Sequence, residues 1–551
     1  MFKPALWASR KSIALGLSLA LSVAISPANA GDAFTFIEKS QPGEHFFTVV
    51  EDLNMFISTL SVQPEGVNGN GSRGVWRDCY STTDPECDLS AQAGTGKGES
   101  GVVGRAILDI CTTAKQVNCV ENLEISNQDA GFKSAKYLRK IRSNREISAN
   151  SKLNYPGGSV AQIWDDSPLN LTSVTKYLVS VAYGIGAFGG DTKYAINNIV
   201  YSIIPYREVI GNFTGPSIDP FLPSTTRATW GSDGRYFFNE DGAAGVRLDF
   251  EDNQKFKLKV RISNQITGWF SGRLKDPAVS IKKFSKESNL ISISGEPVTV
   301  PTIGFRVKTE RKDGKWILEN SSIKENEFFN NNGQSNNTSP QDSGDRKIFD
   351  YLEYFRPLVK DTAIGVNTYW TMKSISSRNN NSCLSDSTRV LGIVTTNAMG
   401  YNPGSPEFKN GYLDYQVAGM HYEPDGTTKV LGSYDLLIRP DAARCLYGFS
   451  KAPVSATISV LGENNGVIPT TLVSENSEWI KLSAYGFHFS APVIRVKISQ
   501  EKTKEIIAEA KNEAAKSNAV RKSVSILCSK GKTMKKVSGA NPKCPPGYKK
   551  K

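Results

Sequence analysis

Apolar and polar residues alternate with a period of two along much of this chain. Over residues 454–460 Val, Ala and Ile alternate with Ser and Thr, and over 493–498 three aliphatic residues alternate with Arg495 and Lys497. Successive side chains of a β-strand point to opposite faces, so this pattern predicts half-buried strands. The signal is clearest between residues 412 and 498, which we therefore expect to form a β domain.

Turn-forming residues separate several of these runs. Pro-Asp-Gly at 424–426 stands between runs at 416–422 and 429–438. Glycine accepts a positive φ and proline presets the angle before it, so this triplet predicts a hairpin. Asp-Gly at 313–314 predicts a second hairpin by the same turn chemistry.

A third hairpin is expected at 246–262, across a turn at 252–253. Its second strand would place Phe256 and the alternate aliphatic residues inward, and Lys255, Lys257, Lys259 and Arg261 outward. Four cations on one face suit an anionic polymer. The acids Asp249 and Glu251 on the first strand instead favour an ion-paired, solvated face.

These patterns predict a mainly β fold, a multidomain chain of antiparallel β-sandwich-like modules with few helices, a C-terminal spacer helix and a small disulfide-closed β-hairpin tail. The expected segments, in chain order, are a signal peptide (1–30), an N-terminal β-rich domain (31–215), a middle β domain (216–329), a polar linker or loop (330–345), a C-terminal β-sandwich-like domain (346–499), the spacer helix (500–518) and the basic disulfide-closed tail (519–551).

The N-terminus has the pattern of a secretory signal peptide. Lys3, Arg10 and Lys11 precede an apolar run at 12–25, and Ala-Asn-Ala at 28–30 supplies small residues for cleavage. The apolar run is too short for a permanent anchor, and no later run reaches the length of a membrane span. The chain is therefore expected to be secreted or held at the cell surface, without a transmembrane segment after cleavage.

The eight cysteines predict four disulfides between sequence neighbours in an oxidising compartment. The expected pairs are Cys79–Cys87, Cys111–Cys119, Cys383–Cys445 and Cys528–Cys544. Strand-like runs flank the second pair, which is expected to close a hairpin loop. A zinc site is the weaker alternative, because close CxxC pairs are absent and the chain has only three histidines.

Most of the formal charge of +12 belongs to the C-terminal tail. Residues 519–551 hold ten Lys or Arg and no acidic residue, while the body of the chain is close to neutral. Such an asymmetric patch favours contact with a polyanion, although a solvated basic end is the plain alternative.

The tail also carries a motif, CxKGKxxKKV followed by PxCPxGYKKK, between Cys528 and Lys551. It resembles a C-terminal segment of secreted and surface proteins of actinobacteria. Two further segments, at 412–460 and 266–277, are similar to parts of uncharacterised exported actinobacterial proteins. The resemblance implies location and β-rich architecture, and it implies no activity.

Motifs for catalysis are weak in this sequence. Ser100 in Gly-Glu-Ser-Gly lacks the spacing of a nucleophile elbow, and the loop at 94–98 lacks the Lys-Ser/Thr of a phosphate loop. Asp165 and Asp166 would be the first candidates for a glycosidase, yet neighbouring carboxylates on a strand point apart. The segment at 239–242 is a candidate calcium site, but it lacks the ligand spacing of an EF-hand.

The sequence thus favours an exported envelope or secreted protein with a binding, adhesive or structural role and no cofactor, catalytic residue or metal ligand. Its expected partner is an anionic cell-wall polymer or a membrane surface, bound through Lys530, Lys532, Lys535, Lys536, Lys543, Lys549, Lys550 and Lys551. A protein or glycan ligand stays open, and no nucleic acid is expected. The alternative is a secreted hydrolase of glycans or peptides with its site in the N-terminal domain.

Overall fold

The fold is described from a computed structural model of the chain. It describes residues 44–48, 56–63, 77–85, 87–89, 101–127, 131–141, 145–167, 176–188, 190–209, 236–238, 244–302, 304–312, 315–318, 349, 352, 356–363, 365–375, 381–402, 404–449, 454–461, 470–489, 493–500, 524–531, 533–539 and 541–551.

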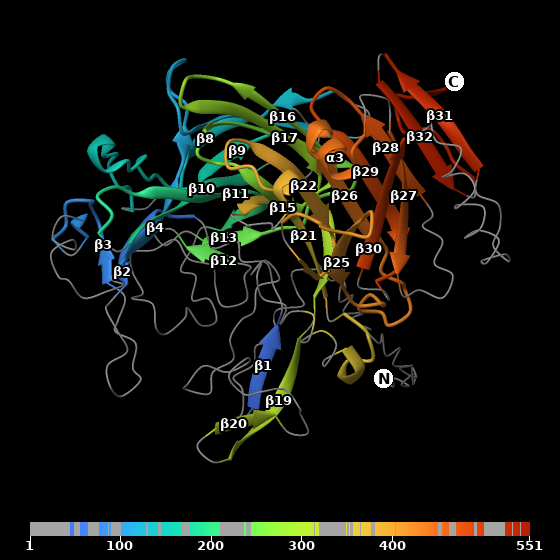
Figure 1. Cartoon of the computed structure of the whole chain (residues 1–551). Coiled ribbons are helices and arrows are strands. Elements are labelled where there is room, and N and C mark those ends of the chain that lie inside the picture. The colour runs from blue at the N-terminus through green and yellow to red at the C-terminus, as the bar shows by residue number, and fades with distance from the viewer. Residues whose placement is uncertain are drawn as a thin grey trace, which may run out of the picture.

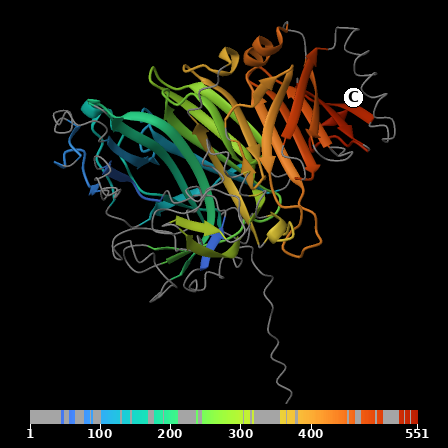
Figure 2. The ribbon, with the colours of Figure 1, turned by 60° about the horizontal axis from the view of Figure 1, so that its bottom comes forward.

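One long sheet runs through the molecule from the N-terminal to the C-terminal strands (Figure 1). Its neighbours, in spatial order, are β3 (Arg77–Cys79), β2 (Thr59–Gln63), β4 (Gly101–Ile107), β10 (Lys176–Phe188), β11 (Ala195–Val209), β21 (Gly365–Ile375), β15 (Gly268–Arg273), β22 (Val390–Thr396), β26 (Gly432–Ile438), β29 (Ile480–Phe487), β28 (Thr470–Glu475), β32 (Thr533–Gly539) and β31 (Val524–Lys530). Figure 2 shows the blue and teal strands at one end of this main sheet and the red strands at the other.

Shorter strands branch from the main sheet. They are β9 (Gln162–Asp165) on β10 with β8 (Lys136–Lys140) beside it, β13 (Ala244–Arg247) on β11 with β12 (Tyr236–Phe238) beside it, β18 (Val298–Thr302) on β21 and β33 (Lys549–Lys550) on β31. Neighbours in the main sheet are antiparallel apart from β15 and β22, which are parallel.

Two smaller sheets cover parts of the main sheet. The first, here called the upper sheet, has the order β16 (Lys275–Lys283), β17 (Ser288–Glu296), β14 (Gln254–Ser263), β6 (Cys119–Asn127) and β5 (Asp109–Ile110), with β7 (Lys133–Ser134) on β6. The second, the lower sheet, has the order β23 (Gly400–Tyr401), β25 (Tyr412–Ala418), β30 (Val493–Gln500) and β27 (Val454–Leu461), with β24 (Glu407–Lys409) on β25. A separate three-stranded sheet joins β1 (Glu44–Thr48), β19 (Gly304–Lys312) and β20 (Lys315–Leu318).

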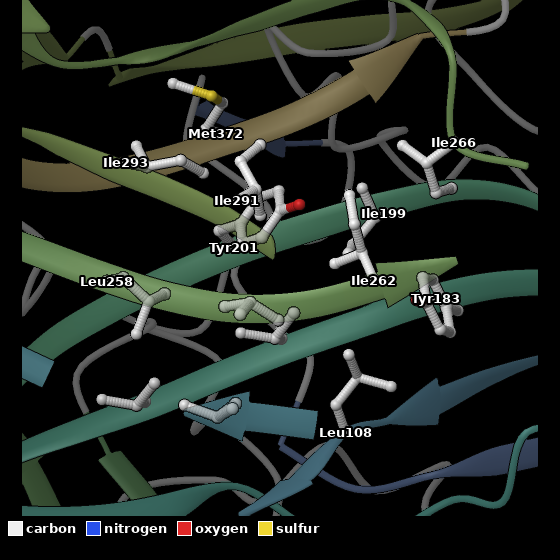
Figure 3. Close-up of a cluster of buried hydrophobic side chains, with 14 of the residues drawn as sticks. Leu108, Tyr183, Ile199, Tyr201, Leu258, Ile262, Ile266, Ile291, Ile293 and Met372 are labelled. Atoms are coloured by element: carbon white, nitrogen blue, oxygen red, sulfur yellow. The ribbon is translucent and has the colours of Figure 1, made fainter. Parts of the chain in front are cut away.

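Strands of the main sheet contribute to three hydrophobic cores, of which the two largest lie against the smaller sheets. Aliphatic residues of β14 and β17 pack on Tyr183, Tyr201 and Met372 in the core beneath the upper sheet (Figure 3). In β26, Leu437 belongs to that core, whereas Leu436 belongs to the core against the lower sheet. Every residue of β22 and β26 is buried, because the main sheet is covered on both faces at these strands; the buried residues include polar ones such as Asp435.

Helix α3 (Pro440–Tyr447) follows β26 directly. Pro440 suits the first helical position because its missing N–H would have no partner there, and Gly448 ends the helix with a φ of 64°. The disulfide Cys383–Cys445 joins the helix to the short 3-10 helix η5 (Ser382–Leu384). This link holds the approach to β22 against the end of β26.

The predicted fold class is confirmed, since the described chain is mainly β with several antiparallel sheets. The four predicted disulfides are all present. The main sheet takes strands from all three expected β domains and from the tail, and the proposed division into domains stays a prediction. The hairpin at Asp-Gly 313–314 is confirmed by the pairing of β19 with β20.

Two predicted hairpins are wrong, because the strands expected to pair with each other pair with different strands. The turn at 424–426 forms, with Gly426 at a φ of 70° and a hydrogen bond from Glu423 N to Thr428 O of 2.8 Å. The strands on its two sides then separate, because β25 joins the lower sheet and β26 the main sheet. Likewise β14 pairs with β6 and β17, not with residues 246–251.

The outward cations of β14 are ion-paired as expected, but with other acids. Lys257 Nζ lies 2.8 Å from Glu124, which also accepts from Lys259, and Arg261 Nε lies 2.6 Å from Glu121. The hairpin predicted around the disulfide Cys111–Cys119 is also wrong. Strands β5 and β6, on the two sides of this loop, pair in parallel.

Several predictions lie outside the described residues. These are the signal peptide 1–30, the linker 330–345, residues 501–518 of the spacer helix, Ser100 with the loop 94–98, the calcium candidate 239–242, and Lys532. Across the described ranges, no helix has both the length and the apolar character that a membrane span requires.

Candidate anion-binding site

The basic tail forms a hairpin that extends the main sheet. Strands β31 and β32 pair around Gly531, whose φ of 59° suits the turn, as the sequence predicts. On its other edge β32 pairs with β28, through Leu472–Val537 and Ser474–Lys535. The hairpin is therefore the last part of the main sheet, at the red end in Figure 1.

The disulfide Cys528–Cys544 folds the final residues back along β31. Cys528 is fully buried, and its Cα lies 5.7 Å from that of Cys544. From there β33 pairs Lys549 with Ser529 and Lys550 with Cys528, and Lys551 N donates to Leu527 O at 2.8 Å. Three lysines thus have fixed positions on the outer edge of β31.

The predicted lysines fall into two groups. Six of them are exposed, namely Lys530, Lys536, Lys543, Lys549, Lys550 and Lys551. Lys535 is only partly exposed, and its ammonium lies 4.5 Å from the centre of the Tyr548 ring. The hairpin therefore presents most, but not all, of its predicted cations to solvent.

Register explains this division. Lys535 lies opposite Cys528, so it shares the face that continues through Ser474 to Lys481 of β29. Lys536 lies opposite Leu527 and Val473, on the other face. We call the face of Lys535 the inner face of the hairpin, because its row of residues leads to the upper sheet, and the face of Lys536 the outer face.

An ion network joins the inner face to the upper sheet. Asp276 of β16 accepts from Lys481 Nζ at 2.5 Å and from Lys255 Nζ at 3.3 Å, and Lys481 also donates to Pro277 O at 2.8 Å. Burial alone would raise the pKa of Asp276, but the charges of Lys481, Lys255 and Lys535 lower it to about 2. Burial lowers the pKa of Lys535, and the attraction of Asp276 only partly offsets it.

A second carboxyl, Asp435 of β26, lies beside this network. It accepts from Ser483 Oγ, from Tyr485 Oη at 2.7 Å and from Asp276 N at 3.2 Å. Burial raises the pKa of Asp435. Two carboxyls whose pKa values are pushed apart are typical of acid–base pairs in enzymes.

The geometry does not suit catalysis here. Asp435 is 0% exposed, so no substrate can reach it. Both oxygens of Asp276 already accept from lysines. The network instead links the upper sheet to the main sheet, with Lys535 of the hairpin close enough to interact with it electrostatically. Sequence patterns gave no sign of it.

Other sequence candidates are dispersed. Asp165 accepts from Ser167 N and Oγ, both at 2.8 Å, while Asp166 is buried near Tyr177 Oη. The two neighbouring carboxyls thus serve different partners and do not converge. His421, one of the three histidines of the chain, contacts Asp361, which also accepts from the His421 backbone N–H at 3.0 Å and lies 3.3 Å from Arg356 Nε.

Within the ranges that the structure describes, no group of His, Cys, Asp and Glu has the geometry to hold a metal ion. Comparisons with models of protein families, with curated proteins and with solved structures find no match. The hairpin is thus the site for which sequence and structure supply the most specific features.

Proposed function

We propose that this chain is an exported envelope protein with a binding or structural role, and that its C-terminal hairpin holds it to an anionic surface. The observation that carries the proposal is the register of β31 with β33, which places Lys549, Lys550 and Lys551 beside the exposed Lys530 and Lys536. Cations on a fixed scaffold lose less conformational entropy on binding than cations on a free tail.

Four disulfides are compatible with an oxidising, extracellular location. The strands that carry the basic patch contain no acidic residue, since residues 519–551 include no Asp or Glu. An anionic partner therefore meets attraction without local competition.

The test is retention of the purified protein on cell-envelope preparations at low and high salt. Deletion of the tail is a poor test, because it would also expose the edge of β28. The better variant replaces five exposed lysines with glutamine, at Lys530, Lys536, Lys549, Lys550 and Lys551. Its control replaces five exposed lysines elsewhere, at Lys115, Lys133, Lys136, Lys282 and Lys286.

We expect the hairpin variant to lose most of its retention and the control variant to keep it. Raising salt to 1 M should release the unaltered protein, because the screening length then falls to about 3 Å. Equal retention of the two variants, or retention that ignores salt, would contradict the proposal.

A further inference from the structure

The outer face of the hairpin combines exposed apolar and cationic side chains. Leu527 is 42% exposed and Met534 is 49% exposed. They are diagonal neighbours, because Leu527 lies opposite Lys536 and Ser529 lies opposite Met534. Two of the eight large apolar side chains exposed in the described chain therefore lie together on this small surface.

Three lysines flank this apolar pair on the same face. Lys536 lies directly opposite Leu527 on β32, and Lys549 lies opposite Ser529 on β33. The backbone bond from Lys551 N to Leu527 O continues that register, so Lys551 lies on the other side of Leu527. Leu527 is thus placed between two cations, with Met534 one row away.

The neighbouring layer ends before it reaches this surface. Val473 of β28 shares the outer face and packs on the core of the lower sheet. The last strand of that sheet, β27, contacts β28 and β29. At this end of the main sheet the hairpin strands β32 and β31 follow β28, and they form the red edge in Figure 1.

We infer that the outer face docks on an anionic lipid bilayer, with Leu527 and Met534 entering the headgroup region and Lys536, Lys549 and Lys551 against lipid phosphates. This inference rests on the proposed function and narrows its partner to a membrane surface. Apolar side chains ringed by cations suit an interface that is negative outside and apolar within.

Two other partners fit this face less well. A hydrophilic anionic polymer would attract the lysines, but it offers no apolar phase to Leu527 and Met534. A second copy of the chain, docked face to face about a two-fold axis, would set the same lysines against one another. Of these three partners, the lipid surface is the one that interacts favourably with both kinds of side chain.

The experiment measures co-sedimentation of the purified protein with vesicles. One set contains phosphatidylcholine alone, and the other contains phosphatidylcholine with phosphatidylglycerol. Soluble inorganic polyphosphate serves as an anion without an apolar phase. The test variant is L527S/M534S, and its matched control is V117S/L431S, which removes two exposed apolar side chains elsewhere.

We expect binding to the phosphatidylglycerol vesicles and not to phosphatidylcholine alone. L527S/M534S should bind these vesicles about tenfold more weakly, as loss of two partly buried apolar groups implies, and should bind polyphosphate as the unaltered protein does. V117S/L431S should match the unaltered protein in both assays.

The outcomes separate the two proposals. Equal vesicle binding by L527S/M534S and the unaltered protein would overturn the lipid inference and leave the anionic-surface function standing. If the five-lysine variant kept its binding to envelopes, vesicles and polyphosphate, the proposed function itself would fail. A dimer in sedimentation equilibrium that L527S/M534S loses would assign the face to a second copy and overturn the lipid inference.

Discussion

Lys535 and Lys536 are chain neighbours with opposite environments. Lys535 lies over the Tyr548 ring and near Asp276, while Lys536 is exposed beside Leu527. The difference follows from the alternation of side chains along β32. A run of lysines that is uniform in sequence is thus divided between a partly buried network and an outer surface.

This division predicts different effects for two otherwise identical substitutions. Lys536→Gln should weaken retention on anionic envelopes or vesicles, because it removes an outward charge. Lys535→Gln should leave retention close to that of the unaltered protein. Salt-dependent binding of both single variants provides the measurement, and a larger loss for Lys535→Gln would contradict the assignment of the two faces.

The second prediction is that removal of different disulfides lowers the free energy of unfolding by different amounts. In the loop-entropy description, Cys383–Cys445 closes a longer loop than Cys111–Cys119, with separations of 62 and 8 residues. Replacing both cysteines by serine should cost about 4 kcal/mol for the long loop and about 2.5 kcal/mol for the short one. Thermal unfolding of the two double variants measures this order, and a reversed order would show that local contacts outweigh loop length.

Local patterns in the sequence were sufficient for strands and turns. The alternation at 493–498 corresponds to β30, in which Ile494, Val496 and Ile498 are buried. The hairpin around Gly531 and the cysteine pairs were also predictable, since each depends on residues close in sequence.

Long-range partners could not be predicted in the same way. The turn at 424–426 forms, yet β25 and β26 enter different sheets, where each pairs with strands distant in sequence. The network of Asp276, Asp435 and Lys481 also depends on residues far apart in sequence, because its members come from β16, β26 and β29. A polar residue within a strand pattern does not reveal which distant charge it will meet.

Buried Arg273 is another residue whose partners could not be predicted from the local sequence. Its side chain is 0% exposed and donates to the backbone oxygens of Thr396, Ala398 and Met399, with the guanidinium 4.4 Å from the centre of the Tyr401 ring. Arginine is rarely fully buried, so nothing in the local sequence indicates this position for Arg273. The structure uses it to satisfy carbonyls where the chain leaves β22, which depends on contacts more than a hundred residues away.

The lowered pKa of Asp276 predicts a loss of stability in acid. A carboxyl whose folded pKa lies below its unfolded value stabilises the fold above the unfolded pKa, and this stabilisation is lost as pH falls toward the folded pKa. For Asp276 the window runs from about 4 down to about 2. Because the side chain is 37% exposed, solvent screening limits the effect to about 1 kcal/mol at neutral pH.

Asp276→Asn should therefore be less stable than the unaltered protein at pH 7, and the difference should shrink as pH approaches 2. The raised pKa of Asp435 acts in the opposite direction, with stabilisation present in acid and lost as pH rises. The charge of Asp276 contributes to the raised pKa of Asp435, so the difference in unfolding free energy reports Asp276 together with its effect on Asp435. A difference that stays constant across this range would contradict the network's role.

The pairing of β32 with β28 predicts that the hairpin stabilises the whole sheet. Val537 is 2% exposed and lies opposite Leu472, so Val537→Ala should create a cavity and cost about 2 kcal/mol. Ser525→Ala, on an exposed position of β31, is the control and should cost less, at most about 1 kcal/mol, because it removes only the exposed hydrogen bond between Ser525 Oγ and Ser538 Oγ. Chemical denaturation monitored by tryptophan fluorescence measures both variants. If the hairpin were only an appended binding element, Val537→Ala would unfold the hairpin alone, and the midpoint for the tryptophans of the main sheet would not move.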